Sequence, residues 1–185
     1  VRGEPARCQH GRSTQGCLAG RGLRRDHYGN EVFGETDAER QLAPRGLADV
    51  QRLSKHLARH NPAPPQWLWV SAATRTRQTA EPLADLWHSQ VIYEPSLYLA
   101  DTLTLLDCLQ GTPDDCSSVA LIGHNPGVSD LAHLLLGQED HQTVPPDLPT
   151  LGVARLTFQG DWPELGAGRC RLASYLTPKG LRTGR

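Results

Sequence analysis

The sequence lacks methionine, has only two phenylalanines, and contains no long run of apolar residues. A membrane-spanning helix needs roughly 18–20 consecutive apolar residues, so we expect no transmembrane segment. The N-terminus has no basic segment followed by an apolar stretch, and we therefore expect no secretory signal. The five cysteines form no CxxC pair, and we expect no zinc site. These absences favour a soluble, cytoplasmic protein with reduced thiols and no metal or cofactor.

Positive and negative charges are nearly balanced, because 19 basic and 20 acidic residues give a formal net charge of −1. A nucleic-acid-binding surface needs a basic excess or aromatic stacking platforms, so we expect no nucleic-acid partner. Lysine is scarce, since only Lys55 and Lys179 are present and every other basic residue is Arg. The planar fork of Arg suits phosphate, although biased codon usage would give the same ratio. The length of 185 residues predicts one domain, which we expect to be monomeric.

Residues 1–36 differ from the rest of the chain. They carry seven Gly and six Arg, and their apolar residues follow neither a strand nor a helix period. We therefore predict irregular backbone there. Because the chain has no Met, we expect either that residues precede Val1 or that this first segment is mistranslated. The resulting division is an irregular N-terminal segment over 1–36, a folded domain over 37–178 and a C-terminal tail over 179–185.

From Asp37 onward, short apolar strands alternate with amphipathic helices. The helical periodicity is clear in Leu47, Val50, Leu53 and Leu57, a helix opened by Pro44 and closed before Asn61. Further helices are predicted over 76–88, 102–109 and 128–135, and strands over 67–70, 91–92, 119–123, 152–158 and 169–175. This alternation is typical of an α/β domain with a mostly parallel central sheet.

Two candidate site residues follow buried strands. Arg75 comes after the strand over 67–70, at a strand-to-helix turn where a guanidinium and free helix N–H groups can bind an anion. His124 comes directly after the strand over 119–123, between Gly123 and an Asn-Pro-Gly turn. An imidazole there can donate to a phosphoryl oxygen or take part in acid–base chemistry, or it can simply cap a turn. Sites in α/β sheets gather at the carboxyl ends of strands, so we expect the two side chains to converge.

The order of these motifs resembles the histidine phosphatase superfamily, and within it the short bacterial phosphohistidine phosphatases of the SixA type. The resemblance covers about 37–175. It rests on a combination of segments, namely Glu39-Arg-Gln-Leu42 with Arg45-Gly46, Ser71-Ala-Ala-Thr-Arg75-Thr-Arg-Gln-Thr-Ala80, Gly123-His-Asn-Pro-Gly127, Glu94-Pro-Ser-Leu-Tyr98 and Asp147-Leu-Pro-Thr150. It implies a three-layer α/β/α fold, no metal and a phosphohistidine enzyme intermediate formed by a neutral His.

The resemblance also implies roles for individual residues. Arg75 matches the family's mid-chain phosphate-binding Arg, His124 its late pocket His, and Arg40 an Arg at the pocket edge. The nucleophile belongs to an Arg-His-Gly triplet at the end of the first strand, and its nearest match is His10, with Gln9 in place of the phosphate-binding Arg. His27 is a second, weaker candidate because no glycine follows it. The residues before His10 make a poor central strand, so the first strand of the fold is the least certain.

Three interpretations of the N-terminal segment stay open. His10 is the nucleophile of a divergent enzyme, the segment is a frameshifted translation of an ordinary enzyme, or the chain has lost catalysis.

Larger family members use a carboxylic acid to protonate the leaving group. Neither Glu94 nor Asp101 occupies the matching position in this sequence, so the general acid has no clear match. A phosphoramidate needs less acid assistance than an ester, which favours a phosphohistidine on a phosphotransfer protein as the substrate. A small-molecule phosphomonoesterase and an inactive phosphate-binding or phosphoprotein-binding member are the alternatives.

Overall fold

The computed structural model describes residues 12–20, 37–60 and 63–183. Its strands are β1 (Arg12–Gly20), β2 (Trp67–Ser71), β3 (Gln90–Glu94), β4 (Ser118–His124), β5 (Val153–Phe158) and β6 (Arg171–Leu176). Its α-helices are α1 (Pro44–His60), α2 (Thr74–Trp87), α3 (Thr102–Gln110), α4 (Gly127–Leu135) and α5 (Pro178–Thr183), and two short 3₁₀ helices are η1 (Pro95–Leu97) and η2 (Trp162–Glu164). The predicted helices and strands after Asp37 are confirmed within a few residues.

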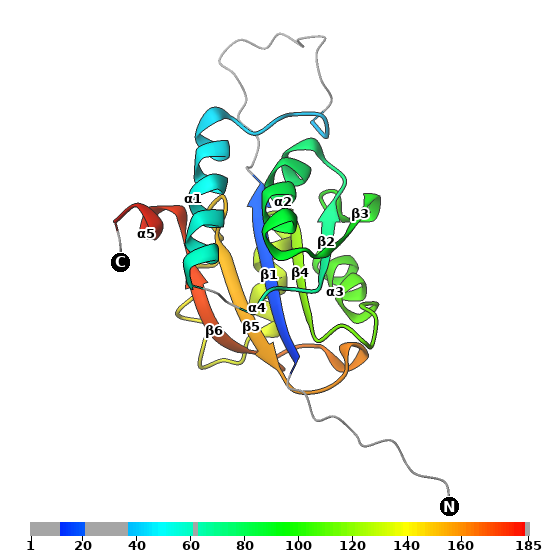
Figure 1. Ribbon diagram of the computed structural model, residues 1–185. Helices are drawn as coiled ribbons and strands as arrows, with labels where there is room; N and C mark the ends of the chain where they lie inside the picture. The colour runs from blue at the N-terminus through cyan, green and yellow to red at the C-terminus, as the bar shows by residue number, and fades with distance from the viewer. Residues whose placement is uncertain (1–11, 21–36, 61–62, 184–185) are drawn as a thin grey trace, which may run out of the picture.

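The six strands form one sheet in the order β3-β2-β4-β1-β5-β6 (Figure 1). The strands from β3 to β1 are parallel to their neighbours, whereas β5 is antiparallel to both β1 and β6. The mostly parallel sheet expected from the sequence is therefore confirmed. The carboxyl ends of β1, β2 and β4 lie at one edge of the sheet, the edge near which α1 begins.

Two helical layers cover the two faces of the sheet. Because successive side chains of a strand point to opposite faces, alternate residues of β4 pack against different layers. Val119 and Leu121 pack in a core with α3 and α4. Ala120 and Ile122 point to the other face and pack with α1 and α2. Every residue of β4 is buried, as expected of a central strand covered on both sides. This is the three-layer α/β/α arrangement that the resemblance implied.

The first helix shows why the amphipathic pattern sets this arrangement. Val50, Leu53 and Leu57 are buried against the sheet, while the opposite face of α1 is polar. Burying three aliphatic side chains contributes several kcal/mol, at about 1.5–3 kcal/mol each.

Among the described residues, no helix combines the length and the apolar character needed to cross a membrane.

The prediction of irregular backbone over 1–36 is wrong for Arg12–Gly20, which form the central strand β1. This segment has little strand propensity of its own. It lies between β4 and β5, and it pairs with both of them. Two open strand edges supply backbone hydrogen bonds on both sides, and such tertiary pairing overrides a weak local preference. The folded domain therefore includes a strand that precedes its predicted boundary at residue 37.

The C-terminal tail predicted over 179–185 is also partly wrong, because α5 occupies most of it. Leu181 packs against the core shared by α1 and α2. Arg182 donates to Oδ2 of Asp49 in α1 over 2.9 Å. One apolar contact and one ion pair therefore attach α5 to the domain, although neither is visible from periodicity in so short a segment.

Candidate active site

Arg75 lies in the first turn of α2, immediately beyond the carboxyl end of β2. The turn that positions it is held by Thr76, whose hydroxyl donates to the carbonyl oxygens of Ser71 and Ala73 over 2.8 and 2.7 Å. The Arg75 residue is only 9% exposed. A buried guanidinium needs hydrogen-bond acceptors in place of water, and an anion supplies them. Arg75 is therefore a candidate anion-binding residue.

His124 is the last residue of β4 and is buried. Because β2 and β4 are parallel neighbours, their carboxyl ends lie side by side. Nε2 of His124 is 2.8 Å from Oγ of Ser71, the last residue of β2. The expected convergence of the two strand ends is therefore observed, and Ser71 joins them.

Asp37 connects the arginines of the site. Arg75 donates through Nη1 to the Asp37 carbonyl oxygen over 2.6 Å and through Nη2 to its Oδ2 over 3.1 Å. The hydroxyl of Tyr98 donates to the same Oδ2 over 2.7 Å, and Nη1 of Arg40 donates to Oδ1 over 3.1 Å. The sequence predicts Arg75 and Arg40 as candidate site residues, whereas it does not predict Asp37. The only local signal for Asp37 is its spacing of three residues to Arg40.

His124 is held in its neutral form. Burial, and secondarily the positive charge of Arg75, lower its pKa from 6.5 to about 4. Nδ1 has no hydrogen-bond partner within the described part of the chain. The ring packs edge-on against Tyr98, with the ring centres 5.4 Å apart. A neutral imidazole fixed at Nε2 can present an N–H at Nδ1 to an oxyanion.

The carboxylates around the site are ionised at neutral pH. A hydrogen bond from Tyr98 lowers the pKa of Asp37, and Arg75 adds to this effect. Glu94 caps η1 by accepting from the Ser96 amide, which lowers its pKa. Asp101 caps α3 by accepting from the Thr104 amide, with the same consequence for its pKa. None of these three described carboxyl groups is set up as a general acid, because each is stabilised as an anion.

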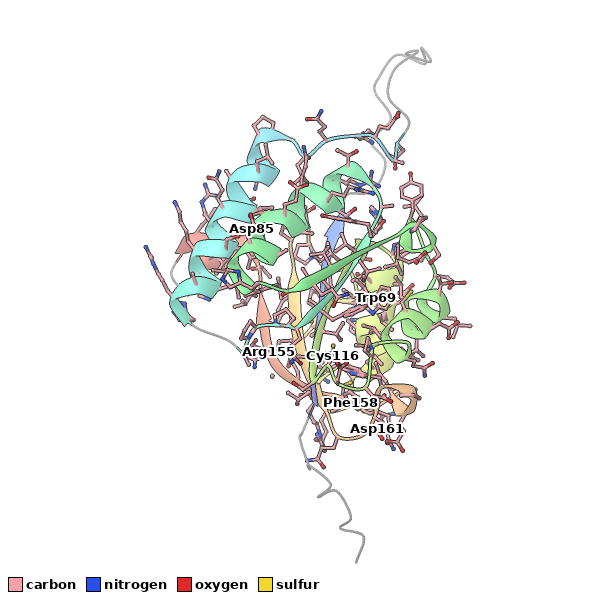
Figure 2. All side chains as sticks on the ribbon, turned by 45° about the vertical axis from the view of Figure 1, so that its right-hand side comes forward. Trp69, Asp85, Cys116, Arg155, Phe158 and Asp161 are labelled. Atoms are coloured by element: carbon pink, nitrogen blue, oxygen red, sulfur yellow. The ribbon has the colours of Figure 1, made fainter. Side chains whose placement is uncertain are left out.

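The strand β1 brings the chain to the site from the far end of the sheet. Arg12 pairs with Phe158, which lies near Cys116 and Asp161 at the edge away from the start of α1 (Figure 2). Gly20, at the other end of β1, pairs with His124. The sequence candidates Gln9 and His10 precede Arg12, and His27 follows Gly20. All three lie outside the described residues.

Comparison with known proteins finds sequence relatives and structures with the same fold. Residues 20–98 match the model of the histidine phosphatase superfamily, branch 1. An uncharacterized protein of Mycobacterium leprae is 29% identical over 151 residues, which are 77% of this chain and 89% of that protein. The range matched by the family model contains Asp37, Arg40, Arg75 and Tyr98, four of the residues that meet at the site.

Solved structures share the fold. One is described as a candidate phosphohistidine phosphatase SixA from Agrobacterium tumefaciens, with a TM-score of 0.72, 24% identity, and 91% of this chain and 99% of that chain covered. Another is the protein histidine phosphatase SixA complexed with tungstate, with a TM-score of 0.69, 22% identity and the same coverage. The match over 20–98, on a sheet that brings Arg75 and His124 to one edge, makes this chain similar to the histidine phosphatase superfamily in sequence and in fold.

Proposed function

We propose that the protein is a metal-independent phosphatase that removes the phosphoryl group from phosphohistidine in a partner protein. The observation that carries the proposal is the meeting of Arg75 and neutral His124 at the carboxyl edge of the sheet, level with the end of β1. Similarity to the histidine phosphatase superfamily over 20–98 and the SixA-like fold support phosphatase chemistry in general. The choice of phosphohistidine depends on the charge states of the site.

The phosphoryl oxygens have enough donors. A guanidinium carries five N–H groups, and Asp37 accepts from two of those of Arg75. The remaining donors include Nε–H, which has no partner among the described residues. Nδ1–H of His124 adds a neutral donor, and Arg40 adds a second positive charge at the edge. Such preorganised donors stabilise the charge that spreads over the phosphoryl oxygens in the transition state.

In the proposed reaction, a neutral enzyme His attacks phosphorus as the substrate's P–N bond breaks. A leaving imidazole that carries a proton on its other nitrogen departs as neutral imidazole, so it needs no proton from the enzyme. Water then attacks the phosphohistidine enzyme, releasing inorganic phosphate and restoring the His. An ester would instead leave as an alkoxide and require an acid. The lowered pKa values of Asp37, Glu94 and Asp101 therefore favour P–N over P–O substrates.

The nucleophile in this proposal is a His outside the described residues. The sequence motif names His10, whereas two observations support His27. The end of β1 that is level with His124 is Gly20, and the chain reaches His27 after it. The family match also begins at residue 20 and so includes His27 but not His10.

The proposal includes the remaining expectations from the sequence, namely a monomer in the cytoplasm that acts on a phosphotransfer protein. Among the described cysteines, Cys108, Cys116 and Cys170 form no disulfide. This fits a reducing compartment, where thiols stay reduced.

The test is hydrolysis of phosphoramidate and of a phosphohistidine-containing protein by the purified chain, with His10→Ala and His27→Ala beside it. Rapid quenching in alkali preserves phosphohistidine, so the phosphoenzyme is detected by mass spectrometry. We expect turnover and a phosphoenzyme that both disappear in His27→Ala and persist in His10→Ala. Loss in His10→Ala alone would restore the assignment from the sequence motif.

Two results would reject the proposal. Phosphate binding without turnover or phosphoenzyme in the parent chain would identify a non-catalytic member. Faster turnover of phosphate esters than of phosphoramidate would identify a small-molecule phosphomonoesterase. Resequencing the 5′ end of the gene would then test whether residues 1–36 are correctly translated.

A further inference from the structure

A cavity of about 620 Å³ adjoins the candidate active site. Its walls are the segment leading into α1 and the first turns of that helix, the loop over 145–150, and the C-terminal stretch around α5. Arg75 and Asp37 belong both to this cavity and to the phosphoryl site. A group bound in the cavity would therefore lie beside the phosphoryl group.

The lining of the cavity is cationic. It contains five positively charged side chains, those of Arg40, Arg45, Arg75, Lys179 and Arg182, against two carboxylates, Asp37 and Asp49. Five positive and two negative charges leave a formal charge of +3. Both carboxylates already accept hydrogen bonds from arginines. Positive potential in a concave site is focused by its low-dielectric walls, so the cavity favours an anion.

The cavity is held in shape by polar contacts in two of its walls. Asp49, with a side chain only 9% exposed, accepts from Arg182 of α5 over 2.9 Å and also pairs with Arg52. The Asn125 side chain, one residue beyond His124, donates to the Leu148 carbonyl oxygen over 2.6 Å. These contacts hold α5 against α1 and the loop over 145–150 against the end of β4, so two walls of the cavity are formed before a ligand arrives.

We infer that this cavity binds carboxylate side chains that flank the phosphohistidine of the substrate protein. The inference rests on the proposed function and names the feature that the enzyme selects in its partner. Arginine forks bind carboxylates through paired N–H donors, and a cavity of this size accommodates one or two acidic side chains. Arg45 lines the cavity with a side chain that is 70% exposed, and its Nε lies 4.0 Å from Oδ2 of Asp49.

The test compares the binding of two fluorescent peptides that carry a non-hydrolysable phosphonate analogue of phosphohistidine. One peptide has Glu residues on both sides of the analogue, and the other has Gln at the same positions. Anisotropy gives the dissociation constants without requiring turnover, so a failure of catalysis and a failure of the subsite are distinguished. We expect the Glu peptide to bind about tenfold more tightly at low salt, and less so at high salt.

Charge reversal locates the effect. Arg45→Glu should remove most of the preference for the Glu peptide, and Lys179→Glu should do the same. Lys55→Glu is the matched control, because Lys55 is exposed on the same helix as Arg45 but does not line the cavity. Equal affinity of the parent chain for the two peptides would overturn the inference. So would an equal loss of preference in Arg45→Glu and Lys55→Glu.

Discussion

Oγ of Ser71 and Nε2 of His124 are 2.8 Å apart, and this hydrogen bond joins the carboxyl ends of two parallel strands. When the hydroxyl donates to Nε2, the single proton of the neutral imidazole is on Nδ1. Ser71 is fully buried, so it is a positioning residue that does not itself touch a substrate. The relationship makes the tautomer of His124 depend on a hydroxyl that is 53 residues away in sequence.

Ser71→Ala tests this dependence. Loss of the hydroxyl leaves Nε2 buried and unpaired, and we expect kcat to fall about tenfold, together with about 1 kcal/mol of stability. Steady-state kinetics and urea unfolding measure the two effects. Ser89→Ala is the control, because its hydroxyl donates to the Pro65 carbonyl oxygen away from the site. Equal kcat values in the two variants would contradict the positioning role.

Arg75→Ala should reduce turnover by about 10²–10³-fold, the scale of losing one preorganised oxyanion donor. The matched control is Arg77→Ala, two residues along α2. The Arg77 guanidinium donates to the Ala72 carbonyl oxygen and stacks over the Tyr93 ring at 4.2 Å, apart from the Asp37 cluster. Near-normal turnover in Arg75→Ala would reject the site assignment. Phosphoramidate hydrolysis, with circular dichroism to verify folding, is the measurement.

The burial of neutral His124 predicts a pH-dependent stability. Its pKa is about 4 in the folded chain and near 6.5 when unfolded, so between these values only the unfolded chain binds the proton. Stability from this group is complete above pH 6.5 and declines as the pH falls towards 4, by roughly 2–3 kcal/mol. Urea midpoints at about pH 7.5 and about pH 4.5 should therefore differ less in His124→Gln than in the parent chain. Ser89→Ala, which removes no titratable group and lies away from the site, should preserve the full difference.

Gly127 provides a test of how the loop that carries Tyr98 packs. A Cβ on Gly127 would lie 2.1 Å from the Ala100 carbonyl oxygen, which is closer than any real contact. Gly127→Ala should therefore cost about 1–3 kcal/mol by forcing the backbone apart, and it should lower activity by moving Tyr98. Gly166→Ala is the control, because a Cβ added there would meet no atom within 4 Å. Thermal melts that are the same for both variants would refute the close approach.

The strands and helices after Asp37, and the positions of Arg75 and His124 beyond two strand ends, could be predicted from the sequence alone. The run over 119–123 is almost entirely apolar, which predicts a strand covered on both faces, and His124 follows it directly. The structure confirms that every residue of this strand is buried. Arg75 was predictable for the same reason, since Trp67–Ser71 is a short apolar strand that turns directly into a helix. In these segments, the local pattern and the fold agree.

The position of β1, the Asp37 cluster and the cationic cavity depend instead on tertiary structure. Arg12–Gly20 has no strand pattern and becomes a strand because β4 and β5 offer hydrogen bonds on both sides. Asp37 meets Arg75 across 38 residues and Tyr98 across 61, and Arg182 meets Asp49 across 133. Periodicity reports only which face of an element is buried. Which charged side chains meet at the carboxyl edge depends on the order of the strands, and that order is a property of the whole sheet.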